Sequence, residues 1–412
     1  MCTHRYSRRL DRLLSNQIGR LNKMSEDKKL KILYHHRVAA QDGQSVHIRE
    51  LVAAFERLGH EIIFVGPSIR PTALGDENKL LSFARRILPL FALELLELAY
   101  GIRVYFKLLA AYKRHNPDFL YERYNLFLPA GTWLKKKTGI PYFVEVNAPL
   151  SEERATYSGL HLHRIARYFE RMTFQNADRL FPVSGALADI ICTMGAPRSS
   201  VTVLHNGITP AEYEAADGSA IRAEFGLENK IVLGFIGFIR EWHRLDRIIQ
   251  ILKHHGTNPD LHLLVVGDGP AIDDCVQLAA TLGVSHRVHC VGFKDRNAIP
   301  DHLAAMDIAL QPAVTAYASP LKLFEYLIAG LATIGPNQPN IREILTHRET
   351  GLLFDPQNFE EAEQAIIELS QDTDLRNRLG KTGQKLIESQ KYTWTHNAEE
   401  ITTLATKYMD RP

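Results

Sequence analysis

The chain has 412 residues, which is too long for one ordinary hydrophobic core and predicts two domains of roughly 150–200 residues each. With 45% hydrophobic and 23% charged residues, it has the balance of a soluble globular protein. Its four cysteines are scattered without a CxxC pair, which argues against a disulfide framework or a zinc site and favours reduced thiols in the cytoplasm.

The first 28 residues are basic and polar and lack the apolar segment of a secretory signal. We expect residues 1–28 to be a disordered tail or to reflect a start codon assigned too early, because Met24 precedes another polar run. The expected location is therefore the cytoplasm.

Charge is divided unevenly along the chain. Residues 1–210 carry 30 Lys and Arg against 19 Asp and Glu, a net charge of +11, whereas the remainder has a net charge of −9. One interpretation is a basic half that faces anionic lipid headgroups or a phosphorylated acceptor, which would place the protein at the inner face of the cytoplasmic membrane. The other is uneven surface charge without a partner, and the sequence does not separate the two.

The first half opens with a βαβ pattern. Lys31–His36 predicts a strand, Val46–Leu58 an amphipathic helix and Glu61–Pro67 a second buried strand. Such a unit implies parallel strands joined by a right-handed crossover. Further strands in this half are expected at 119–121, 142–146 and 179–183.

A similar alternation starts again after a polar break at 215–219. A helix is expected at 245–254, and strands are expected at 231–238, 261–270, 288–293, 307–312 and 331–336. Two such series predict an α/β protein with two doubly wound, Rossmann-like domains facing across a cleft. We expect an N-terminal domain over 29–207, a C-terminal domain over 208–390, and a final helix in 391–412 that packs back on the N-terminal domain.

The segment Arg86–Tyr112 is markedly apolar, but Glu94, Glu97 and Arg103 interrupt it, so it has no run of ~18 uncharged residues that could span a bilayer. It fits either a helix packed against the sheet or an amphipathic helix lying in the plane of a membrane surface. We favour the packed helix, because long buried helices are ordinary in this architecture.

Several common active-site motifs are absent from the sequence. There is no GxGxxG after a strand and no GxxxxGK[ST], GxSxG or HExxH. Asp273 and Asp274 fall in a helical pattern and predict a solvated helix face rather than a metal site. The basic residues form no stripe interleaved with aromatic residues, so nucleic-acid binding is not expected. We expect no cofactor and no metal.

The most informative stretch is YASPLKLFEYLIAGLATIGP, Tyr317–Pro336. Ser319 suits the N-cap and Pro320 the first turn of a helix that runs through Ile328. The unpaired N–H groups at the start of such a helix attract anions. Glu325 lies on the second turn, where its carboxylate can accept hydrogen bonds from ribose hydroxyls beside an anchored diphosphate.

Four short motifs follow one another along the chain: HNGI at 205–208, VVGDGP at 265–270, SPLKLFEY at 319–326 and GLLF at 351–354. Together with the run DGQSVHIRELVAAFERLGHEIIFVGP at 42–67, this series resembles the retaining family 4 glycosyltransferases, which have the GT-B fold. The resemblance covers about 31–355. It implies a hexosyltransferase that moves a sugar from a nucleotide diphospho-sugar to a glycan or lipid-linked acceptor, with retention and without a metal, as in members associated with bacterial surface polysaccharide.

The resemblance also implies site residues on the donor side. Glu325 aligns with the second acid of the family's paired-glutamate motif, which holds the ribose, and the amides of 319–321 fall where the diphosphate binds. Arg240 and His243 fall near the family's Arg/Lys pair, which makes them catalytic candidates together with Glu325. The other donor-side candidates are Gly237, Gly267, Gly269, Val291, Phe293, Tyr317, Ser319, Pro320, Leu321 and Lys322.

Three positions depart from the family pattern. Tyr317 replaces the first glutamate of the pair, so the usual contact to the donor sugar must change or come from elsewhere. His243 replaces the lysine, and its charge depends on a reference pKa of ~6.5. Asn147 stands where the family usually has a histidine. The cations that would compensate for His243 are Arg240, Arg244 and Lys322.

On the acceptor side, Gly43 and Gln44 lie in the first loop, and Glu145 and Asn147 lie at a strand end, where ligands bind in open sheets. His47 fits a core position or a ligand contact equally well.

In the implied mechanism, Arg240, a protonated His243 and the amides of 319–321 stabilise the departing diphosphate. Two alternatives remain. One is a non-catalytic nucleotide-sugar or glycan-binding module on a degenerate scaffold, suggested by Tyr317. The other is a GT-B nucleotide-sugar epimerase, for which the sequence shows no set of catalytic acids.

Overall fold

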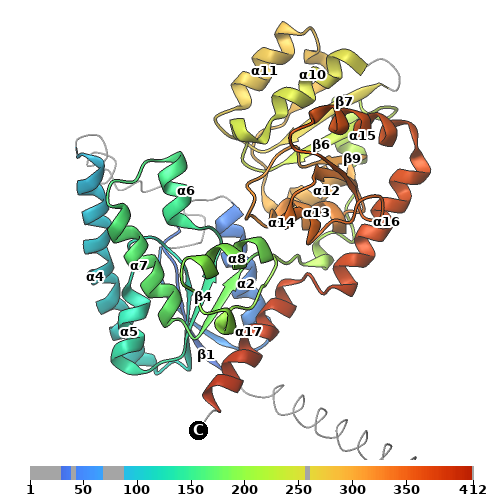
Figure 1. Ribbon diagram of the computed structural model, residues 1–412. Helices are drawn as coiled ribbons and strands as arrows, with labels where there is room; N and C mark the ends of the chain where they lie inside the picture. Colours follow the sequence, from blue (N-terminus) through green and yellow to red (C-terminus); the bar gives the residue numbers. More distant parts are fainter. Residues whose placement is uncertain (1–28, 39–42, 68–87, 256–259, 411–412) are drawn as a thin grey trace, which may run out of the picture.

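The computed structural model describes residues 29–38, 43–67, 88–255 and 260–410. The expected tail at 1–28 lies outside the described residues. The chain forms two parallel α/β sheets, one in each half, with helices packed on them (Figure 1).

The first sheet has five strands in the order β2-β1-β3-β4-β5, and every pair is parallel. Its strands are β1 (Lys31–His35), β2 (Glu61–Val65), β3 (Phe119–Arg123), β4 (Tyr142–Val146) and β5 (Arg179–Pro182). Its helices are α2 (Gly43–Arg57), α4 (Leu90–His115), α5 (Ala130–Thr138), α6 (Leu150–Tyr157), α7 (His163–Asn176) and α8 (Gly185–Thr193).

The second sheet has six parallel strands in the order β11-β10-β9-β6-β7-β8. Its strands are β6 (Ile231–Ile236), β7 (Leu261–Val266), β8 (Val288–Cys290), β9 (Ile308–Leu310), β10 (Ala332–Pro336) and β11 (Leu352–Phe354). The GLLF motif contains β11, a strand that we did not expect, because three residues are too few to show a periodic pattern. The helices are α9 (Ser219–Phe225), α10 (Leu245–His255), α11 (Ile272–Thr281), α12 (Ile299–Ala304), α13 (Leu321–Ile328), α14 (Pro339–Arg342), α15 (Phe359–Gln371) and α16 (Thr373–Ser389).

Both sheets have buried faces on both sides, as parallel sheets covered by helices require. In β1, Leu33 points into one core cluster, whereas Ile32 and Tyr34 point into the other, because successive side chains alternate across a strand. All six residues of β7 are buried. The strands are therefore continuous apolar runs, which is why their positions can be predicted from the sequence.

The chain returns to its N-terminal half through α17 (Trp394–Met409), which follows α16 directly (Figure 1). Trp394, Ala398 and Ile401 on α17 belong to the same buried cluster as Leu51 of α2. The segment before α17 also pairs with the HNGI motif, since Thr393 forms a β-bridge with Ile208. The two halves are thus tied together at the point where the chain passes from one to the other.

Helix α4 packs against strand β2 and helix α5, which confirms our preference for a packed helix. It buries only a narrow face, which includes Val104 and Leu108, and its opposite face is exposed. Among the described residues, no helix is long and apolar enough to cross a membrane.

Candidate functional site

The donor-side candidates gather at the carboxyl edge of the second sheet, where the strand order reverses. Strand β6 pairs with β9 on one side and β7 on the other, so the loops after β6 and β9 leave the sheet in opposite directions. Ligands of doubly wound sheets bind in the crevice that such a reversal opens. The loop after β6 carries Arg240 and His243, and the loop after β9 leads through Tyr317 to α13.

Two of the donor-side glycines, Gly237 and Gly267, form a continuous backbone seam with Gly292 at this edge. The Gly237 amide donates to the Val266 carbonyl at 2.9 Å, and the Gly267 amide donates to the Gly292 carbonyl at 2.9 Å. Gly267 has a φ of +135°, and a Cβ there would lie 2.0 Å from the Gly237 carbonyl oxygen. Only glycine fits that position, so the loops after β6, β7 and β8 pack as one rigid wall.

Helix α13 begins one residue later than the sequence predicted. Pro320 is its N-cap, and no side chain caps the helix. The expectation that Ser319 would be the N-cap is therefore wrong. The Ser319 hydroxyl is buried, and among the described residues it has no hydrogen-bond partner. A proline at the N-cap leaves the first amides of the helix unpaired by any side chain, which suits an anion.

Two asparagines fix the turn that leads into α13. The Asn206 side-chain amide of the HNGI motif donates to the Ser319 carbonyl at 2.5 Å. The Asn340 side-chain amide donates to the carbonyls of Thr315 and Ala318 at 3.0 and 2.7 Å. These contacts come from distant parts of the chain, so no local pattern pointed to Asn340, whereas the HNGI motif did point to Asn206.

Two basic side chains lie against the Phe235 ring below the start of α13. The Lys322 ammonium lies 3.7 Å from the ring centroid, and the His243 ring lies 5.2 Å from it. Burial lowers the pKa of Lys322 to about 7. A half-buried lysine beside a helix N-terminus favours anion binding, because a bound anion offsets the free-energy cost of burying the protonated amine.

His243 is neutral, contrary to the expectation of a protonated ring. Burial, with added repulsion from Lys322 and Arg240, lowers its pKa to about 3. Its Nδ1 accepts a hydrogen bond from the Arg240 amide at 3.1 Å, so the proton of the neutral ring is on Nε2. His243 can therefore offer an N–H to an anion but not a full charge. The Arg240 guanidinium lies 4.9 and 4.8 Å from the ring centroids of Phe238 and Trp242 and is exposed.

Glu325 is buried beside three groups that the sequence did not assign to the site. Arg296 forms an ion pair with its carboxylate, and the Tyr213 hydroxyl donates to it at 3.4 Å. Arg296 also lies 3.6 Å from Glu212. Since Arg296 is shared between two carboxylates, Glu325 remains able to accept other donors. Arg296 follows β8 in a loop without a motif, so no sequence signal could have identified it.

Tyr317 reaches the opposite domain. Its hydroxyl donates a hydrogen bond to Glu153 of α6, and its carbonyl accepts one from the Ser184 hydroxyl at 2.7 Å. The Tyr157 ring of the same helix lies 5.9 Å from the Trp242 ring. Burial and the Glu153 carboxylate raise the pKa of Tyr317. A carboxylate is thus present beside position 317 even though the chain has tyrosine there, and it comes from the N-terminal half.

On the acceptor side, Glu145 is the centre of a buried polar cluster. Its carboxylate contacts Arg123, accepts from Tyr121 and Asn147 at 3.1 and 2.5 Å, and lies 3.1 Å from His47 Nε2. Burial alone would raise the pKa of Glu145, but His47 and Arg123 hold it well below its usual range. Glu145 is 2% exposed, whereas Asn147, whose side-chain amide donates to it, is half-buried.

The first loop approaches the donor helix from the other side. A Cβ on Gly43 would lie 3.6 Å from Leu321, so the start of α2 and the start of α13 face each other closely. Gln44 follows on the exposed side of α2. Further along the wall, Phe293 is exposed and Val291 half-buried, and Gly269 has a φ of +157°.

No group of three or more metal-ligating side chains occurs in the described parts of the chain. Asp273 and Asp274 lie in the first turn of α11. Positive charge at the candidate site comes from Arg240, Lys322 and the start of α13.

Comparisons with known proteins agree on one class. Two family models match consecutive parts of the chain: the model described as Glycosyltransferase Family 4 matches residues 41–212, and the model described as Glycosyl transferases group 1 matches residues 218–386. No gap longer than a few residues separates the two matches.

Individual relatives are distant. The chain is 25% identical over 221 residues to N-acetyl-alpha-D-glucosaminyl L-malate synthase of Bacillus anthracis, covering 53% of this chain and 57% of the relative. It is 24% identical to a lipopolysaccharide core biosynthesis glycosyltransferase of Rhizobium meliloti, covering 58% and 68%. The match therefore spans little more than half the length of the first of these relatives.

A solved structure shares the fold. The chain superposes on an Anabaena protein solved with UDP-glucose with a TM-score of 0.70 at 18% identity, covering 92% of this chain and all of the other. Two parallel α/β sheets of five and six strands, related in this way, form the GT-B fold.

Proposed function

Since this chain belongs to the group 1, family 4 glycosyltransferases, we propose that it transfers a sugar from a nucleotide diphospho-sugar to an acceptor hydroxyl. The single observation that carries the proposal is that Lys322, at the uncapped start of α13, and His243 meet at the Phe235 ring, with Arg240 in the same loop as His243. This arrangement offers positive charge and N–H donors to one anion, and a diphosphate leaving group is an anion that gains charge as its bond to the sugar breaks.

The residues have distinct roles in this proposal. Lys322 and Arg240 neutralise the diphosphate, and the Nε2–H of His243 donates to one of its oxygens. The backbone amides at the start of α13, from Leu321 onwards, complete the anion site. Glu325 holds the ribose, and the wall that includes Val291 and Phe293 lies beside the base.

Retention follows if the acceptor hydroxyl attacks the face of the sugar that the diphosphate leaves. The bond from the acceptor oxygen to the anomeric carbon forms as the bond to the diphosphate breaks, and the departing phosphate oxygen takes the acceptor proton. No side-chain base is then required. Because Gly43 faces Leu321 closely, the acceptor can reach this face from the N-terminal half.

We further propose that the donated sugar is a hexose and that the acceptor is a glycan or a lipid-linked glycan of polysaccharide or glycoconjugate biosynthesis. The Rhizobium relative is named for lipopolysaccharide core biosynthesis, which supports this class of acceptor. Such acceptors lie at the inner face of the cytoplasmic membrane, and the net charge of +11 on residues 1–210 suits a peripheral contact there.

A thermal-shift panel of UDP-, GDP- and ADP-sugars tests donor binding, because a bound ligand raises the unfolding temperature by mass action. We expect one nucleotide class to stabilise the protein and the purified protein to release the nucleotide diphosphate from that donor. Stabilisation by none of them would contradict the proposal. Binding without any hydrolysis or transfer would instead favour the non-catalytic module.

The Arg240→Ala variant tests the catalytic arrangement. Loss of one preorganised cation should lower turnover by about 10²–10³-fold while the donor still stabilises the protein. Arg244→Ala is the matched control, because Arg244 lies in the same loop but pairs with Asp246. Unchanged turnover in Arg240→Ala would refute this assignment.

A further inference from the structure

Helix α4 has two acids, and both face the protein. Glu94 is fully buried and accepts hydrogen bonds from the amides of His161 and Leu162 at 2.9 and 2.7 Å. Glu97 forms a bidentate ion pair with Arg154 at 2.7 and 3.2 Å. The negative charge that interrupts this apolar sequence is therefore removed from the outer face of the helix.

The outer face of α4 carries a strip of large apolar side chains. Phe91, Leu95, Ile102 and Phe106 are 48%, 47%, 50% and 62% exposed. Their spacing of 4, 7 and 4 residues keeps them on one line along the helix, over roughly 22 Å at 1.5 Å per residue. In the part of the chain that the structure describes, about half of each of these side chains stays open to solvent.

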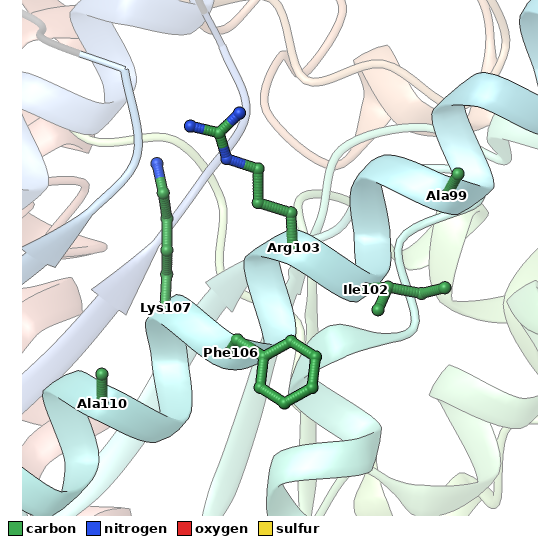
Figure 2. Close-up of a pocket in the computed structure, with 6 residues that line it drawn as sticks. All are labelled: Ala99, Ile102, Arg103, Phe106, Lys107 and Ala110. Atoms are coloured by element: carbon green, nitrogen blue, oxygen red, sulfur yellow. The ribbon is translucent and has the colours of Figure 1, made fainter.

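A line of cations runs beside the apolar strip. Arg103, Lys107 and Arg114 are exposed, and their spacing of 4 and 7 residues repeats that of the apolar line. Figure 2 shows Arg103 and Lys107 extending from one side of the helix, whereas Phe106 and Ile102 extend from other sides. Ala99 and Ala110 leave a shallow hollow between these longer side chains.

We propose that this face of α4 docks on an anionic phospholipid bilayer, with the helix lying in the plane of the membrane. The apolar strip would enter the boundary between headgroups and acyl chains, and the three cations would contact lipid phosphates. A protein partner would need an apolar groove lined by acids at matching positions, whereas an anionic bilayer supplies both features everywhere. This face specifies where the peripheral membrane contact proposed above is made, and it rests on the proposed transferase function only for its biological role.

Flotation of the full chain with vesicles of phosphatidylcholine, with or without about 30% phosphatidylglycerol, tests the proposal. We expect binding to the anionic vesicles only, weakened by salt. The double variants Ile102→Ser/Phe106→Ser and Arg103→Gln/Lys107→Gln should each lower binding by about tenfold or more. Both should keep the wild-type thermal shift with UDP-glucose or GDP-mannose, whichever binds.

Two control variants match these changes elsewhere on the surface. Lys381→Gln/Lys385→Gln removes two exposed lysines at the same spacing from α16, and Val276→Ser removes an exposed apolar side chain from α11. Both controls should bind vesicles within about twofold of wild type.

Absent vesicle binding by wild type, or equal losses in test and control variants, would overturn the proposal. So would a dimer that the α4 variants dissociate without vesicle binding, because the face would then join two copies of the chain. Absent donor stabilisation with intact vesicle binding would count against the proposed function alone.

Discussion

Lys322 determines how the charge of the donor site responds to pH. Its pKa in the free protein is lowered to about 7, and a bound diphosphate must raise it, since the anion favours the charged amine. The bound state therefore holds more protons than the free state above pH 7, and donor affinity falls as pH rises through that value.

We predict that a nucleotide sugar binds about tenfold more weakly at pH 8 than at pH 6, the ratio given by the protonated fraction of a group with a pKa of about 7. Its diphosphate does not titrate in this range. The Lys322→Met variant should bind the nucleotide sugar weakly at both pH values, so the pH dependence of its affinity should disappear. The Lys253→Met variant, at an exposed position on α10, should keep this pH dependence. Titration calorimetry at the two pH values measures both effects, and a persistent slope in Lys322→Met would assign it to another group.

The pair formed by Tyr317 and Glu153 lies at one of the three positions where the sequence departs from the family pattern. The carboxylate that the sequence lacks at position 317 is supplied by Glu153 from the other half of the protein. In the proposed binding mode, the donor sugar extends from the diphosphate away from Glu325 and towards this pair. We infer that Glu153 accepts hydrogen bonds from sugar hydroxyls.

We predict that Glu153→Gln lowers kcat/KM for the preferred donor by about 10-fold or more, because the amide that replaces the carboxylate no longer matches the sugar hydroxyls. Binding of the free nucleoside diphosphate should not change, because that ligand has no sugar at this position. Glu152→Gln, at the adjacent exposed position, is the control. Equal losses for the nucleotide and the nucleotide sugar would show that Glu153 only holds the two halves together.

At the scale of elements, the glycine seam between the loops after β6, β7 and β8 makes the donor wall rigid. At Gly267, both φ and the approach of the Gly237 carbonyl require glycine. Gly226 is a useful comparison, because its φ is +66° but nothing lies within 4 Å of an added Cβ. The two positions separate backbone strain from a steric clash.

We predict that Gly267→Ala lowers the free energy of unfolding by about 2–4 kcal/mol and abolishes donor binding, because the seam must open. Gly226→Ala should cost about 1 kcal/mol and leave donor binding intact. Chemical denaturation with a donor thermal shift measures both. Similar costs at the two positions would mean that the seam adapts to the extra atom.

At the scale of the whole molecule, α17 links the two halves of the chain. Trp394 is 1% exposed, and its ring lies 4.7 Å from that of His47 on α2. A Cβ on Gly207 of the HNGI motif would lie 2.4 Å from the Trp394 amide nitrogen, so the linker and α17 pass each other closely. The link therefore touches both the acceptor-side cluster and the turn before α13.

We predict that Trp394→Ala lowers the free energy of unfolding by about 3–5 kcal/mol, the usual cost of emptying a buried aromatic site. Because His47 loses its neighbour, transfer should fall more than donor binding does. Trp242→Ala removes an exposed tryptophan from the donor loop and serves as the comparison for stability. A loss below about 1 kcal/mol in Trp394→Ala would show that α17 does not couple the halves.

The sequence by itself determined the parallel sheets, because buried strands are continuous apolar runs and helices carry a regular stripe. It also predicted where the candidate donor site lies, because the SPLKLFEY and HNGI motifs are local. It did not determine that Pro320 rather than Ser319 caps α13, or that His243 is neutral, since both depend on neighbours brought in by folding.

Only the tertiary structure revealed Arg296 beside Glu325, Asn340 under the turn before α13, and Glu153 beside Tyr317. These partners lie 22 to 164 positions apart, so no local pattern could pair them. The same holds for α4, because the sequence favoured a packed helix without showing which of its faces would stay exposed. Burial and charge pairing are properties of the packed chain, and they decide which of its residues remain available to a ligand or a membrane.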